Sequence, residues 1–157
     1  MMGEREEAME TFEPEMVVFC CQNSVDEDET EAVRRQYGGR VRIVRMPCSG
    51  KTDVRYLMKA FESGADGVLI VGCPEAACRS LDGNMRAKKR VGYVRSLLEE
   101  IGFGGDRIEM AHLSPSMQEG LSEVVRAMIE KIEEIGPNPI KNHRKGAKCA
   151  KKTSKGV

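Results

Sequence analysis

The chain of 157 residues contains no tryptophan, few aromatic residues and no long hydrophobic run. A membrane-spanning helix needs about 20 consecutive apolar residues, so we expect no membrane span. The acidic segment 1–15 lacks an apolar centre and is therefore not a secretory signal. The lysine-rich segment 141–157 lacks the interleaved aromatic residues on which bases stack. Nucleic-acid binding is accordingly not expected.

Two common functional motifs are also incomplete or missing. Segment 49–52 (SGKT) resembles the end of a phosphate-binding loop, but the motif requires glycine five residues before Gly50, where the chain has Arg45. No C-x-x-C pair is present, which disfavours a thiol redox protein working through Cys20/Cys21 or Cys73/Cys78. That alternative would require a reversible disulfide in the metal-free chain.

Charge is balanced over the whole chain but unevenly distributed along it. The chain has 25 basic and 25 acidic residues, and segment 141–157 holds seven of the basic ones and no acidic one. The remainder thus carries 18 basic and 25 acidic side chains. We expect a flexible acidic leader over 1–15, one folded domain over 16–140, and a basic disordered tail over 141–157.

Apolar runs and helical stripes alternate along the domain. The expected strands are 16–21, 41–46, 67–72 and 108–112. The expected helices are 26–37, 53–63, 84–101 and a last one that starts near Ser114 or Ser116 and ends before Gly136. This alternation predicts an α/β fold: an open, mostly parallel sheet with helices on both faces, flavodoxin-like or Rossmann-like.

Cysteines stand where these strands should end. Cys21 and Cys48 follow the first two strands, and Cys73 follows the third, with Cys78 one short loop later. The carboxyl ends of parallel strands meet at one edge of the sheet, which is where such folds bind ligands. Cys20 and Cys21 should point to opposite faces of their strand, so either of them could reach the shared site.

Four thiolates at one point suit an iron–sulfur cluster or a structural zinc ion. Zinc sites usually pair two close cysteine knuckles, and here only Cys73 and Cys78 are close in sequence. The spacing therefore favours a cluster, with zinc as the alternative. Six cysteines without a secretory signal also indicate a reducing compartment, the cytoplasm.

Several longer stretches make a specific resemblance. They are 19–24 (FCCQNS), 41–50 (VRIVRMPCSG), 60–69 (AFESGADGVL), Gly72-Cys73, Cys78, Gly83-Asn84, Arg90-Val91 and 97–102 (LLEEIG). Through them, the region from Val17 to about Gly136 resembles the delta, or iron–sulfur, subunit of methyl-viologen-reducing hydrogenase. The same module occurs with heterodisulfide reductase A-like flavoproteins. Many members of that family have cysteine where this chain has Ser24.

The resemblance implies a non-catalytic 2Fe–2S electron-transfer subunit of an oxidoreductase complex. Such a subunit relays electrons between a hydrogenase or formate dehydrogenase and a heterodisulfide reductase-type flavoprotein. The implied cluster ligands are Cys21, Cys48, Cys73 and Cys78, with Cys20 as the alternative to Cys21. A zinc-stapled adaptor in such a complex is the main alternative function.

Overall fold

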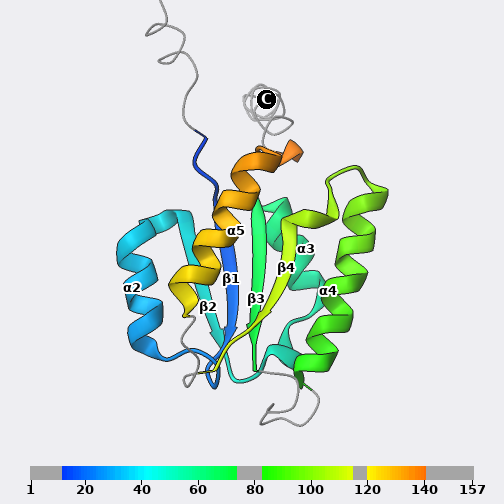
Figure 1. Ribbon diagram of the computed structural model, residues 1–157. Helices are drawn as coiled ribbons and strands as arrows, with labels where there is room; N and C mark the ends of the chain where they lie inside the picture. The colour runs from blue at the N-terminus through cyan, green and yellow to red at the C-terminus, as the bar shows by residue number, and fades with distance from the viewer. Residues whose placement is uncertain (1–11, 74–82, 115–119, 141–157) are drawn as a thin grey trace, which may run out of the picture.

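Four short strands form a single parallel sheet. The computed structural model describes residues 12–73, 83–114 and 120–140. Its strands are β1 (Met16–Cys21), β2 (Val41–Met46), β3 (Gly67–Gly72) and β4 (Ile108–His112). They lie in the order β2-β1-β3-β4, and every neighbouring pair is parallel (Figure 1). The four expected strands and the α/β class are thereby confirmed.

A helix follows each strand. These helices are α2 (Glu27–Tyr37), α3 (Val54–Glu62), α4 (Gly83–Glu100) and α5 (Leu121–Ile135). The carboxylates of Asp26 and Asp53 cap α2 and α3 by accepting hydrogen bonds from backbone N–H groups of the first turn. After α2 the chain continues through Gly38, whose φ of 63° is a conformation that glycine adopts without strain.

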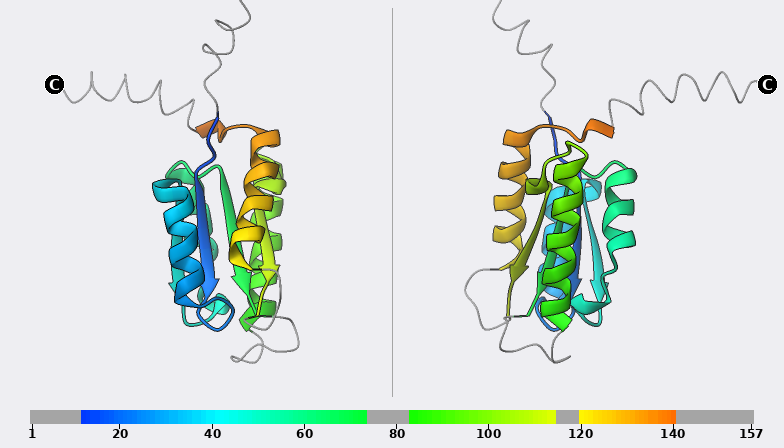
Figure 2. Two further views of the ribbon diagram at one scale, coloured as in Figure 1. Left: turned by 60° about the vertical axis from the view of Figure 1, so that its left-hand side comes forward. Right: turned by 90° about the vertical axis from the view of Figure 1, so that its right-hand side faces the viewer.

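The helices cover the two faces of the sheet in pairs. Helices α2 and α5 pack on one face around Val18, Val33 and Val125, and α3 and α4 pack on the other around Phe61, Ile70 and Val94 (Figure 2). Strand β3 is buried along its whole length. This arrangement explains its unbroken apolar sequence, because both of its faces are covered.

The last helix begins later than the sequence suggested. It starts at Leu121 after Gly120, not at Ser114 or Ser116. The Gly120 N–H donates to the Glu123 carboxylate at 3.1 Å, and the Leu121 N–H donates to the Glu29 carboxylate of α2 at 3.0 Å. These two carboxylates satisfy N–H groups that a helix start leaves without intrahelical partners.

A buried guanidinium holds the amino-terminal edge of the sheet together. Arg107 is 3% exposed and donates hydrogen bonds to four backbone carbonyls. Those carbonyls belong to Asp66, Phe103, Gly136 and Pro137, at 2.9 to 3.1 Å. The lowered pKa of Arg107 follows from its burial. The network ties the connections before β3 and β4 to the segment after α5.

The segments outside the domain core are described only in part. In the expected leader, the Glu15 N–H donates to the Asp66 carboxylate at 2.7 Å. Residues 1–11 and the expected basic tail, 141–157, lie outside the described residues. Among the helices that are described, none is long and apolar enough to cross a membrane.

Candidate functional site

The order of the strands reverses between β1 and β3, and two cysteines meet at that point. Strand β1 leads to β2 on one side, while β3 and β4 follow on the other. Cys21 is the last residue of β1, and Cys73 directly follows β3. Their Sγ atoms are 3.8 Å apart, and both thiols are buried. A reversal of strand order is the usual ligand site of an open α/β sheet.

The neighbouring Cys20 points away from this site. Its side chain lies in the core between the sheet and helices α2 and α5, among Val25, Val71 and Leu113. Burial raises the pKa of the Cys20 thiol to about 11, against the opposing effect of Arg45. A thiol in this environment stays protonated and is a poor metal ligand.

Cys48 lies in the loop that follows β2, next to the contact between Cys21 and Cys73. The Cys21 thiol contacts the Pro47 carbonyl at 3.8 Å. On the other side, a Cβ on Gly72 would lie 3.0 Å from the Ser49 hydroxyl, so Ser49 rests on the end of β3. The Gly50 N–H donates to Cys48 Sγ at 3.4 Å. A backbone N–H directed at sulfur stabilises negative charge there.

Helix α4 fixes the position of this loop. Arg90 donates hydrogen bonds to the carbonyls of Gly50 and Thr52, the latter at 2.8 Å. Gly50 also packs directly on Gly83, since a Cβ at Gly50 would lie 2.8 Å from the Gly83 Cα. The Cys48 loop and the start of α4 are therefore held at a fixed separation, which only glycine permits.

The backbone and the thiol of Cys73 are held by three side chains. The Asn84 amide donates to the Cys73 carbonyl at 3.1 Å, and His112 Nδ1 lies 2.9 Å from the same oxygen. The Ser24 hydroxyl donates to Cys73 Sγ at 3.4 Å. No partner for His112 could be inferred from the sequence, and the structure supplies one. The contacts of Asn84 and Arg90 were not anticipated, because both involve backbone carbonyls distant in sequence.

The structure brings together only part of the proposed ligand set. Cys21 and Cys73 are in contact, and Cys48 stands in the adjacent loop. Cys78 and Cys149 lie outside the described residues. Within 12–73, 83–114 and 120–140, no three His, Cys, Asp or Glu side chains are close enough to hold a metal ion. The described cysteines, Cys20, Cys21, Cys48 and Cys73, are free thiols.

A separate groove of about 480 Å³ lies beside β2 and α3. Its described lining residues include Val17, Val44 and Tyr56, together with the basic residues Arg40 and Lys59, and no cysteine. The groove is thus distinct from the thiol site at the strand ends.

The arrangement defines an α/β domain with buried thiols at a strand switch point, and comparison with known sequences identifies its family. Residues 16–136 match the model of the methyl-viologen-reducing hydrogenase delta subunit. The chain belongs to this family, as the motifs in its sequence indicated.

Two kinds of protein are found among its relatives. The chain is 40% identical to the F420-non-reducing hydrogenase vhu iron-sulfur subunit of Methanocaldococcus jannaschii over 132 residues, which cover 83% of this chain and 98% of the relative. The counterpart in Methanococcus maripaludis is 37% identical, over 82% of this chain and 98% of that protein. The second group is represented by a much longer protein of Methanosarcina acetivorans, the A subunit of ferredoxin/F(420)H(2)-dependent CoB-CoM heterodisulfide reductase. It is 32% identical over 79% of this chain and 16% of its own length.

Proposed function

We propose that this chain is a 2Fe–2S electron-transfer subunit whose cluster is held by Cys21, Cys48, Cys73 and Cys78. The observation that carries the proposal is the contact of the Cys21 and Cys73 thiols at the strand switch point. Membership of a family whose relatives are named iron-sulfur subunits supports the same cofactor class. The buried, protonated Cys20 favours Cys21 as the ligand from β1.

The donor groups around these thiols suit an anionic sulfur site. The Ser24 hydroxyl points to Cys73 Sγ, and the Gly50 N–H points to Cys48 Sγ. Hydrogen bonds to sulfur and burial are two of the factors that set the reduction potential of an iron–sulfur cluster. A bound cluster would supply reversible one-electron storage. The protein would supply the ligands, these donors and exclusion of water.

Four cysteine ligands leave no open coordination position, so we infer that the chain relays electrons and performs no catalytic step. Its proposed donor is a hydrogenase or formate dehydrogenase, and its proposed acceptor is a heterodisulfide reductase A-like flavoprotein. The relatives' names support the hydrogenase and the reductase. The free cysteines suit work in the reducing cytoplasm.

The test is anaerobic purification followed by iron, sulfide and zinc analysis, with electron paramagnetic resonance of the reduced protein. We expect two irons and two sulfides per chain and a 2Fe–2S signal. Cys48→Ser and Cys73→Ser should each abolish the signal. The matched variants Cys20→Ser and Cys149→Ser should retain it. Full iron content in both ligand variants would refute the assignment.

A zinc-stapled adaptor is the second candidate, because zinc also binds four thiolates. It predicts one zinc per chain, no sulfide, no visible colour, and unfolding on chelation. Zinc without sulfide in protein purified anaerobically would replace the relay with this function.

A further inference from the structure

The helices on the two faces of the sheet carry opposite net charge. Helices α2 and α5 together have eight acidic and four basic side chains, whereas α3 and α4 have three acidic and seven basic ones. The basic excess is concentrated in the first half of α4. The net charge of the whole sequence is zero, but the helices on the two faces of the sheet differ in the sign of their net charge.

The charge order along α4 opposes its own dipole. Its first turn has no acidic residue and its last turn has no basic one, while Glu99 and Glu100 stand at its carboxyl end. Helix α2 has the favourable order, with three acids in its first turn and two arginines in its last. Cations near a helix amino end and anions near its carboxyl end destabilise the helix. The charges of α4 therefore do not stabilise the helix through its dipole.

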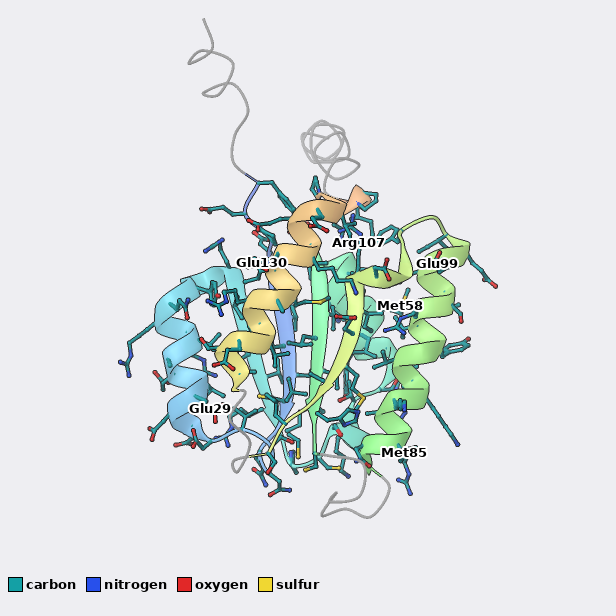
Figure 3. The ribbon with its side chains drawn as sticks, in the orientation of Figure 1. Glu29, Met58, Met85, Glu99, Arg107 and Glu130 are labelled. Atoms are coloured by element: carbon teal, nitrogen blue, oxygen red, sulfur yellow. The ribbon has the colours of Figure 1, made fainter. Side chains whose placement is uncertain are left out.

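These charges lie at the edge of the sheet that carries the thiols. Met85, in the first turn of α4, lies at the carboxyl ends of the strands, and Glu99 lies at the opposite edge (Figure 3). Arg86 and Arg90 are four residues apart, a spacing at which like charges repel on a helix. Arg90 donates hydrogen bonds to the carbonyls of Gly50 and Thr52. Lys51, Arg86, Lys88 and Lys89 are exposed.

We define the α4 basic surface as Lys51, Met85, Arg86, Lys88 and Lys89. All five side chains are exposed, and Met85, Lys88 and Lys89 share one helix face because they are three and four residues apart. Lys51 adjoins them, since its neighbour Gly50 packs on Gly83. Met85 has a flexible, polarizable side chain, so it offers an adaptable apolar contact among the neighbouring cations.

We propose that the α4 basic surface docks an acidic face of a protein that exchanges electrons with this chain. That the partner exchanges electrons with this chain rests on the proposed function. The location of the docking surface rests on the charge pattern. Opposite charge on the partner would speed association by electrostatic steering. The acidic α2 and α5 face would repel such a partner, so docking is directed to the thiol edge.

The first experiment maps an acidic peptide and needs no cluster. A deca-glutamate peptide is titrated into the full-length, isotope-labelled chain and followed by nuclear magnetic resonance. We expect the amide signals of 83–92 and 49–52 to shift, and K88E/K89E to weaken this binding about tenfold at low salt. The control R35E/R126E makes the same change in net charge on the α2 and α5 face and should leave the binding within twofold.

Three results would overturn the proposal. Shifts confined to the segment 141–157 would place acidic binding in the tail. Equal loss in both double variants would reduce the effect to net charge. Tighter binding of a ten-residue thymidine oligonucleotide than of the peptide, at the same amides, would make the surface a nucleic-acid site.

The second experiment follows the electron. Each cluster reduced in the chain gives one electron to hexacyanoferrate(III), which becomes hexacyanoferrate(II), and the rate is measured by stopped flow. K88E/K89E should slow this oxidation about tenfold at low salt and should accelerate oxidation by the cationic hexaamminecobalt(III). Rates equal to those of R35E/R126E would contradict the proposal. Absence of any iron would instead refute the proposed function, while the peptide titration would still decide the surface.

Discussion

The contact between Gly50 and Gly83 offers a direct test of how the site is built. A Cβ at Gly50 would lie 2.8 Å from the Gly83 Cα and 3.0 Å from the Gly83 carbonyl oxygen. Ordinary contacts between carbon atoms are about 3.5–4.0 Å, so the two backbones would have to separate by roughly 0.7 Å. Both neighbouring atoms belong to backbone and cannot rotate away. Gly50→Ala should therefore displace the loop that carries Cys48.

The energetic cost follows from two opposing effects. Overpacking a close contact costs about 1–3 kcal/mol. Replacing glycine by alanine also restricts the unfolded chain, which stabilises a protein by about 0.4–1 kcal/mol. We expect Gly50→Ala to lower the free energy of unfolding by about 1–2 kcal/mol and to reduce the retained iron. The assay is urea unfolding followed by circular dichroism, with iron analysis of the same samples.

Gly92 provides the matched control on the same helix. It is exposed in the interior of α4, and a Cβ there would meet no atom within 4 Å. Gly92→Ala should raise the free energy of unfolding by about 0.5–1 kcal/mol and leave iron unchanged. Should Gly50→Ala prove as stable as Gly92→Ala, with full iron content, the loop would not be fixed by this contact.

Three further predictions concern the buried side chains of Arg107 and Cys20. Arg107→Met leaves four backbone carbonyls without their donor and should lower the free energy of unfolding in urea by about 2–4 kcal/mol; an unchanged urea midpoint would show that the network is dispensable. Cys20 should resist iodoacetamide at pH 8 in the folded chain, because its pKa is about 11. As the pH rises from 9 to 11, the Cys20 thiol loses its proton first in the unfolded chain. The free energy of unfolding should therefore fall in this range, by up to about 1.4 kcal/mol per pH unit. Cys20→Ala should make this pH dependence less steep.

The strands could be predicted to the residue because their signals are local. β1 is a short apolar run, β2 and β4 mix apolar with charged or polar residues, and the run over Gly67–Gly72 is uninterrupted because both faces of β3 are covered. The start of α5 could not be found in this way. Ser114 and Ser116 suggested an early start, but Glu29 accepts from the Leu121 N–H across 92 residues of sequence. A helix boundary set by a tertiary contact leaves no local pattern.

At the candidate site too, local features could be predicted from the sequence, whereas contacts between distant residues could not. Parallel strands bring their carboxyl ends to one edge, so the sequence could place Cys21 and Cys73 near each other. It could not choose between Cys20 and Cys21, because alternation along a strand does not say which face carries the site. The sequence also provided no sign that Asn84 and Arg90 donate hydrogen bonds to backbone carbonyls. Such contacts depend on where distant carbonyls point, which no motif encodes.

The contact between Ser24 and Cys73 gives a last prediction, which links the structure to the potential of the proposed cluster. Ser24 is 1% exposed, and its hydroxyl donates to Cys73 Sγ at 3.4 Å. A donor to a ligand sulfur favours the more negative, reduced state, so Ser24→Ala should lower the reduction potential. If the hydrogen bond stabilises the reduced cluster about 0.5–1 kcal/mol more than the oxidised one, its loss lowers the reduction potential by about 20–45 mV. The conversion uses about 59 mV for a factor of ten in a one-electron step. Redox titration followed by electron paramagnetic resonance measures it, with the exposed Ser96→Ala as control. An unchanged or higher potential in Ser24→Ala at full iron content would mean that this hydroxyl does not act on a ligand sulfur.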